Sequence, residues 1–175
     1  MRLVPLLACA LLPAQAIAQA PRCIAQDEAA ALVTFALPTL VQSVAQRCAP
    51  ELPRSAYLTA NASLLSDRYR PEADAAWPSA RAAIGRLFSQ FLGQPMPAEM
   101  NSDLVRTLAE PLIGNLLAKQ VSTADCTVVD TAVANVAPLS GRAIGRLAVL
   151  ALTVADRKDK GIAGVLHICR PEHLS

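Results

Sequence analysis

The chain has 175 residues, of which 53% are hydrophobic and only 3% aromatic, and its formal net charge is +2 at pH 7. This length suits one domain with a substantial core, and apolar content supplied mostly by Ala and Leu is typical of packed helices rather than of a β-sandwich or a disordered chain. The nearly neutral charge, without clustered basic residues or stacking aromatics, argues against nucleic acid as a partner.

The amino terminus has the three parts of a secretory signal peptide. Arg2 is followed by the apolar run Leu3–Leu12 and then by small residues at alternate positions. The small-x-small rule allows cleavage after Ala18 or after Ala20, and we expect the first because the second would place Pro21 beside the scissile bond.

The chain is therefore divided into a signal peptide, residues 1–18, and a single helical domain, residues 19–175. Lipidation at Cys9 is the less favoured alternative, because the residues before it are too few for a complete leader. The expected localisation is periplasmic or secreted.

The mature chain keeps four cysteines, an even number that predicts two disulfides in an exported protein. They are Cys23, Cys48, Cys126 and Cys169. Three pairings are open. Pairing between neighbours in sequence is the simplest, but the helix predicted between Cys23 and Cys48 would hold these two roughly 31 Å apart, which argues against that pair.

A metal site at the carboxyl end is a weaker alternative use of the cysteines. His167, Cys169, Glu172 and His173 crowd there, but their spacing matches no zinc motif and an oxidising compartment consumes thiols. We expect no metal and no cofactor.

The fold class predicted for residues 19–175 is all-α: a small single-domain bundle of about six helices, several of them kinked by proline and stapled by the two disulfides. Apolar residues at steps of three and four, together with cap residues and prolines, predict helices over about 27–47, 55–70, 72–93, 102–119 and 124–136, and from about 138 onward. The first is expected to continue through Pro38 with a kink, whereas Pro71 is expected to end the second.

One uncharged run, Leu147–Ala155, is expected to form the central buried helix. As a helix it would rise only about 14 Å, against about 30 Å of bilayer hydrocarbon, so no transmembrane span is predicted in the mature chain. The apolar stripes of the other helices are expected to cover this run. The stripe of the fourth helix consists of Leu104, Leu108, Leu112 and Leu116.

The pentapeptide Ala-Ile-Gly-Arg-Leu occurs twice, at 83–87 and 143–147. Duplication of a helical hairpin and chance in an Ala-rich chain both explain the repeat. Gly85 and Gly145 are expected to let a neighbouring helix approach closely. Arg86 and Arg146 then need a route to solvent or an acidic partner, for which Asp103, Glu110 and Asp130 are the candidates.

The segment 67–77 combines charge, aromatic rings and a predicted helix boundary, which is a composition common at binding hot spots. The candidate binding residues are Arg68, Tyr69, Arg70, Asp74 and Trp77, together with Arg146 beside the apolar run. The plainer alternative is that Trp77 anchors the core, Tyr69 packs at a helix end and the charges solvate a turn.

No catalytic motif is present, and both histidines lie in the last nine residues. A carboxylate mechanism through Asp67, Glu72 or Asp74 has no further support, so no catalytic residue is assigned and an enzyme is the less favoured class.

Three hypotheses of different classes follow. The first is an exported helical interaction or structural module of a bacterial-type cell envelope, which binds another envelope protein. The second is a carrier of an apolar small molecule in a cavity between helices. The third is an envelope hydrolase.

Overall fold

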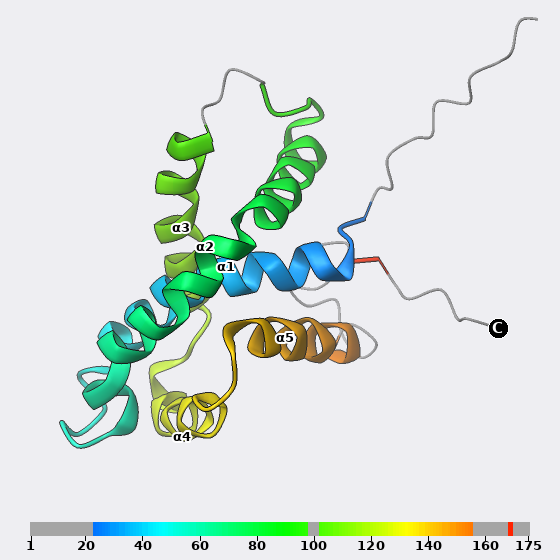
Figure 1. Cartoon of the computed structure of the whole chain (residues 1–175). Helices are drawn as coiled ribbons and strands as arrows, with labels where there is room; N and C mark the ends of the chain where they lie inside the picture. The colour runs from blue at the N-terminus through cyan, green and yellow to red at the C-terminus, as the bar shows by residue number, and fades with distance from the viewer. Residues whose placement is uncertain (1–22, 98–101, 156–167, 170–175) are drawn as a thin grey trace, which may run out of the picture.

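The computed structural model describes residues 23–97, 102–155 and 168–169 (Figure 1). The described residues form five α-helices, a 3-10 turn and a single isolated bridge, between Ile24 and Ile168. The helices are α1 (Gln26–Cys48), α2 (Tyr57–Leu92), α3 (Ser102–Lys119), α4 (Cys126–Val136) and α5 (Gly141–Ala155), and the turn η1 (Thr123–Asp125) precedes α4. The all-α prediction is confirmed.

Helix α1 is the centre of the fold, because α2, α3 and α5 all pack on it. Figure 1 shows α1 crossing the middle of the molecule, with α3 on one side and α5 on the other. Four consecutive residues in its middle, Phe35–Pro38, are buried, as expected for a helix surrounded by other helices. The prediction that Leu147–Ala155 is the central helix is therefore wrong.

That run forms most of α5, which lies on the surface with one face toward α1. Val149 is buried there, but Leu147, Leu150 and Val154 are each at least half exposed. Gly145, just before the run, lies in close contact with α1, so α5 packs on α1 along the face that contains Gly145 and Val149. The absence of charge in the run predicted a helix correctly but predicted its position wrongly.

Helix α1 is also the one helix, among those described, that is long and apolar enough by composition to cross a membrane, with a mean hydropathy of 1.4 over its most apolar window. Half of that window is buried inside the fold. The core helix of a folded domain has the same composition as a membrane span, and α1 occupies a core position here.

Helix α2 is a single helix of 36 residues that continues through Pro71 and Pro78. Our prediction of two helices separated at Pro71 is wrong, and this accounts for five α-helices instead of six within the described residues. An internal proline costs about 3 kcal/mol because it lacks an N–H and crowds the carbonyl four residues back. Buried residues before and after Pro71 lie on the same face of α2, so continuous packing outweighs this local cost. They are Leu65, Tyr69, Ala73, Ala80 and Ala83.

Two disulfides connect the chain, as predicted. The bond Cys48–Cys126 is buried and joins the end of α1 to the start of α4. The bond Cys23–Cys169 lies at the other end of α1, next to the Ile24–Ile168 bridge, and is partly exposed. Pairing of sequence neighbours is wrong, and the argument from helix length is right, since the 23 residues of α1 separate Cys23 from Cys48.

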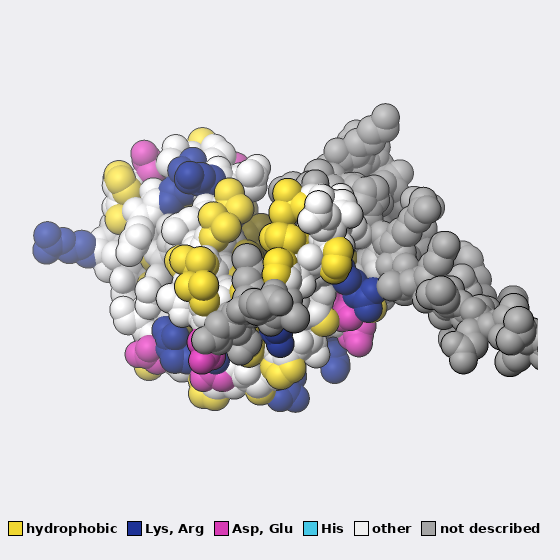
Figure 2. All heavy atoms as spheres, turned by 90° about the horizontal axis from the view of Figure 1, so that it is seen from above, with side chains coloured by type: hydrophobic (Ala, Val, Ile, Leu, Met, Phe, Trp, Pro, Cys, Tyr) yellow, Lys and Arg dark blue, Asp and Glu magenta, His cyan; other side chains and the backbone are white. Residues whose placement is uncertain are grey.

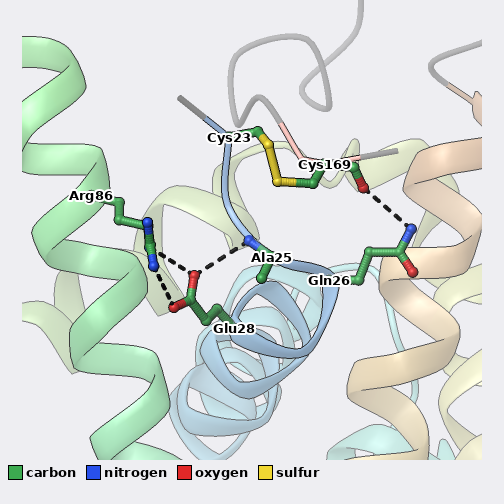
Figure 3. The surroundings of a disulfide bond; sticks show 6 residues. All are labelled: Cys23, Ala25, Gln26, Glu28, Arg86 and Cys169. Atoms are coloured by element: carbon green, nitrogen blue, oxygen red, sulfur yellow. Dashed lines mark hydrogen bonds and ion pairs between the residues drawn. A yellow bond between two sulfur atoms is a disulfide. The ribbon is translucent and has the colours of Figure 1, made fainter. Parts of the chain in front are cut away.

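Figure 3 shows how the Cys23–Cys169 corner is held. The backbone N–H of Cys169 donates to the carbonyl of Ile24 at 2.8 Å, and the Gln26 side chain donates to the carbonyl of Cys169 at 3.4 Å. Glu28 accepts from the N–H of Ala25 at the start of α1 and also pairs with Arg86 of α2. The corner therefore joins residue 169, near the carboxyl terminus, to the first turn of α1.

Candidate functional site

Of the candidate binding residues, Arg68 and Tyr69 both contact the connection between α4 and α5. The Arg68 guanidinium donates to the carbonyls of Ala137 (2.7 Å) and Pro138 (3.1 Å), and the buried Tyr69 hydroxyl donates to Ala137 at 3.2 Å. Carbonyls at the end of a helix have no partner within it, so these donors stabilise the end of α4. Burial raises the pKa of Tyr69 above 10, although the positive charge of Arg68 opposes the shift.

Glu72, one turn further along α2, caps the start of α5. Its two carboxylate oxygens accept from the N–H groups of Gly141 and Arg142, each at 3.0 Å. Asp130 of α4 does the same for α2, accepting from the N–H groups of Tyr57 and Leu58. Unpaired N–H groups and the positive end of the helix dipole make a carboxylate stabilising at these positions. The carboxylates of this region thus fix three helices to one another.

Arg70, Asp74 and Trp77 contact other parts of the fold. Arg70 lies 3.8 Å from Glu110 of α3, and Asp74 pairs with Arg106, also on α3. The ring of Trp77 packs on Phe35 of α1, with centroids 4.9 Å apart.

The five residues on α2 are therefore divided among three neighbours, which are the connection between α4 and α5, helix α3 and helix α1, and they do not form one joint site. Arg146 is exposed on α5 and has no ion pair with a described residue. Each of the five contributes to packing between helices, while Arg146 points toward solvent.

The two Ala-Ile-Gly-Arg-Leu segments lie in α2 and in α5, which both pack on α1, and they have different surroundings. A Cβ added at Gly145 would clash with Oγ1 of Thr34 and lie 2.5 Å from the carbonyl oxygen of Ala30, whereas one added at Gly85 would meet only Met96, at 3.9 Å. Close approach of a helix is confirmed at Gly145 and not at Gly85. Arg86 pairs with Glu28, at 2.9 Å, and not with the acids we expected.

The metal-ligating and carboxylate side chains considered from the sequence can be located in part within the described residues. No group of three or more His, Cys, Asp or Glu side chains is close enough there to hold a metal ion. His167, Glu172 and His173 lie outside the described residues. Glu72 and Asp74, two of the three carboxylates considered for catalysis, are engaged as described above.

The surface feature that our sequence reasoning missed is a row of leucines along α3. Their exposed fractions are 54% for Leu104, 61% for Leu108, 59% for Leu112 and 51% for Leu116. We expected these side chains to form the core stripe of the helix, and this prediction is wrong. We name them the α3 leucine row.

Small and polar residues make the closest described contacts of α3 with α1. Glu110 accepts a hydrogen bond from Thr39 at 3.0 Å, and Ala118 is buried. A Cβ added at Gly114 would lie 2.6 Å from Cγ2 of Thr39, so the glycine allows this close contact. The spacing of Gly114 and Ala118, four residues apart, was the signal in the sequence that could have indicated the packed face.

Exposed apolar side chains are found on other parts of the surface as well. Figure 2 shows apolar side chains gathered on the face seen from above, with many of the charged side chains nearer its rim. Leu147, Leu150 and Val154 add a second exposed apolar strip on α5. Exposed apolar surface of this extent is a common mark of interaction sites.

In comparisons with models of protein families, with curated proteins and with solved structures, the chain matches none of them.

Proposed function

We propose that this protein is an exported helical interaction module of a bacterial-type cell envelope. The leader pattern of residues 1–18 and the two disulfides support a place in the periplasm or outside the cell, because disulfides form and persist in oxidising compartments. Residues 19–175 are the functional domain in this proposal, and its partner is another envelope protein.

The α3 leucine row carries the proposal. Burying a leucine side chain completely is worth about 1.5–3 kcal/mol, so four that are half exposed retain roughly 4 kcal/mol that a partner can use. The row also lies on a helix whose other face is fixed to the rest of the fold, so it is presented without reorganisation. A preformed apolar ridge binds at a lower entropic cost than a flexible one.

Of the six candidate binding residues, Arg146 fits an interface best. It is exposed on α5, just before the apolar strip that includes Leu147 and Leu150. Arg68, Tyr69, Arg70, Asp74 and Trp77 support the interaction surface indirectly, by holding α2 to the helices around it. The carrier and hydrolase hypotheses remain alternatives, and no observation on the described residues favours either.

Site-specific photo-cross-linking in the envelope tests this function. A photoreactive residue replaces Leu112 in the leucine row, and the same residue replaces Leu64, which is 68% exposed on α2, as a matched control. We expect a discrete cross-linked protein at Leu112 and none at Leu64. Equal labelling at both positions, or none at either, would contradict the proposal.

Export is measured in the same cells. Intact-mass analysis of the protein from the periplasmic or secreted fraction should give a chain that begins at Gln19 and carries no free thiol. Recovery of the uncleaved chain in the cytoplasm with five free thiols would contradict the proposed location.

A further inference from the structure

Helix α5 has an outward face of its own, on the side opposite to the one that packs on α1. The packed side contains the buried residues Gly145 and Val149. The exposed residues recur at steps of three and four, which places them together on the other side of the helix. They form a face about 18 Å long, which we name the α5 face, and they are Arg142, Arg146, Leu147, Leu150, Ala151 and Val154.

The α5 face combines apolar side chains and positive charge without negative charge. Leu147, Leu150 and Val154 are 50%, 59% and 51% exposed. Arg142 and Arg146 precede them along the same face, and neither forms an ion pair with a described residue. Among the described α-helices, α5 alone has no acidic residue, whereas α3 has two acids and two bases. The face therefore suits a partner that is apolar inside and negatively charged at its surface.

Arg142 is also placed against the local preference of the helix. It lies in the first turn of α5, where the positive end of the helix dipole disfavours a base. The carboxylate of Glu72 accepts hydrogen bonds from the N–H groups of this turn and offsets part of that cost, but Arg142 remains exposed. A base kept at such a position, beside apolar residues that also face outward, indicates a contact outside the fold.

We propose that the α5 face docks on the surface of an anionic phospholipid bilayer. In this arrangement Leu147, Leu150 and Val154 insert at the boundary of the acyl chains, and Arg142 and Arg146 contact the lipid phosphates. Helices that lie in a bilayer surface show this combination of apolar and basic residues. Arginine suits the boundary because its methylene stem packs on apolar groups while its guanidinium donates hydrogen bonds to phosphate.

A bilayer fits the α5 face better than a second protein does. The apolar residues form a ridge on one helix, and a protein would need a groove of matching shape with acidic residues along one side. A bilayer of anionic lipid supplies both properties everywhere on its surface, because its lipids rearrange around a ridge. An exported protein of a bacterial-type envelope also faces such bilayers.

The inference goes beyond the proposed function, which rests on the leucine row of α3. Helices α3 and α5 both pack on α1, and Figure 1 shows them on different sides of it. The α5 face can therefore rest on a bilayer while the α3 leucine row contacts a protein partner. The two surfaces can be tested separately.

The composition of the α5 face predicts weak and reversible binding. Its apolar side chains are already about half buried, so only part of their surface is left for the bilayer. Each base near an anionic membrane strengthens binding by about fivefold, and this contribution decreases as salt is added. We expect an association constant on the order of 10⁴ M⁻¹, similar to that of a single myristoyl chain.

Flotation of the oxidised mature chain with lipid vesicles tests the inference. The vesicles are phosphatidylcholine alone, or phosphatidylcholine mixed with the anionic lipid phosphatidylglycerol. We expect the chain to float with the mixed vesicles at low salt, and to lose most of this binding at high salt or without phosphatidylglycerol. Leu150→Glu and Arg146→Glu should each lower the association constant by about fivefold or more.

Two matched controls make the same substitutions elsewhere. Leu64→Glu on α2 and Arg54→Glu at an exposed loop position should leave the association constant nearly unchanged. Arg146→Lys, which keeps the charge, should retain most of the binding, and far-UV circular dichroism confirms that each variant remains helical. A photoreactive residue at Leu150 gives a second measurement that introduces no charge: a lipid adduct is expected there and none at Leu64.

Four results would overturn the bilayer contact. They are no flotation, equal flotation with neutral vesicles, equal effects of the α5 and control substitutions, and cross-linking of Leu150 to a protein instead of to lipid. Loss of flotation in Leu112→Glu but not in Leu150→Glu would also contradict it, because the lipid would then contact the α3 leucine row.

Cross-linking at Leu112 distinguishes the proposed function from this inference. Flotation through the α5 face with no protein cross-linked at Leu112 would support the bilayer contact and contradict the protein interaction module. A protein cross-linked at Leu112 without flotation of the chain would leave the proposed function standing and remove the bilayer.

Discussion

The same substitution in the two Ala-Ile-Gly-Arg-Leu segments should have opposite effects on stability. Gly145→Ala places a methyl group 2.5 Å from the carbonyl oxygen of Ala30 and against the Thr34 hydroxyl, which donates to that carbonyl. The backbone of α1 cannot move aside without disturbing its contacts with three helices. Gly85→Ala meets only the flexible end of Met96, at 3.9 Å, which is an ordinary contact.

Two effects determine the magnitude. Replacing Gly by Ala inside a helix gains about 1 kcal/mol of helix propensity, whereas overpacking a tight contact costs about 1–3 kcal/mol. The contact at Gly145 is with backbone and is far shorter than a normal Cβ contact, so its cost falls in the upper part of this range, about 2–3 kcal/mol. Gly145→Ala should therefore lose about 1–2 kcal/mol net, and Gly85→Ala should gain up to about 1 kcal/mol. For a domain of this size, each kcal/mol shifts the Tm by about 2–4 °C.

Thermal unfolding followed by circular dichroism, with both disulfides intact, measures the difference. We expect Gly145→Ala to unfold below the native protein and Gly85→Ala to unfold at or above it. If Gly145→Ala is as stable as the native chain, or if both variants are destabilised equally, the close packing of α5 on α1 is refuted.

Three further predictions concern the contacts that hold the helices together. Under native conditions a dithiol should reduce the partly exposed Cys23–Cys169 disulfide before the buried Cys48–Cys126 disulfide. Mass spectrometry after alkylation would show the order. Reduction of Cys48–Cys126 first would contradict the burial of that bond. Glu72→Ala removes the cap of α5 and should lower the free energy of unfolding by about 1–2 kcal/mol, measured with a denaturant. Glu72→Gln should retain part of this stability. An unchanged unfolding midpoint for Glu72→Ala would show that the cap is unimportant. The pKa of Tyr69 is higher in the folded than in the unfolded chain, so the folded state keeps the phenol proton to higher pH. The contribution of Tyr69 to stability should therefore be constant below pH 10 and fall as the pH rises above it. Tyr69→Phe should lack this part of the alkaline loss, and an identical pH profile for the two proteins would contradict the prediction.

The sequence predicted best those features that depend on local pattern. The bounds of α1, α3 and α4 follow the predicted helices closely, and α2 ends where expected, at Gly93, whose φ of 68° requires glycine. Helix length argued correctly against the pairing of Cys23 with Cys48. Each of these results rests on geometry within one element or between its two ends.

The sequence pattern did not predict which face of a helix packs on the rest of the fold. The leucine row has helical spacing whether it faces the core or solvent, and here Gly114 and Ala118 provide the closer approach to α1. Pro71 has a known local cost, but burial on both sides of it along α2 outweighs that cost. Tertiary packing decided both cases, and neither decision is visible in the periodicity of a single helix.

The interaction surface itself was missed for the same reason. Segment 67–77 has the composition of a binding site, yet Arg68, Tyr69 and Glu72 make their hydrogen bonds inside the fold. Charged and aromatic residues stabilise a helix bundle by capping and packing as effectively as they bind partners. The exposed apolar residues of α3 resembled a core stripe and were read as one.

Photo-cross-linking along α3 in the intact envelope is the most direct measurement of whether the leucine row is an interface. A photoreactive residue is placed in turn at Leu104, Leu108, Leu112 and Leu116, with Leu64 as the reference position. We predict one discrete cross-linked product at the row, strongest at Leu108 and Leu112, and none at Leu64. Labelling that is absent along the row, or no stronger there than at Leu64, would contradict the interaction surface.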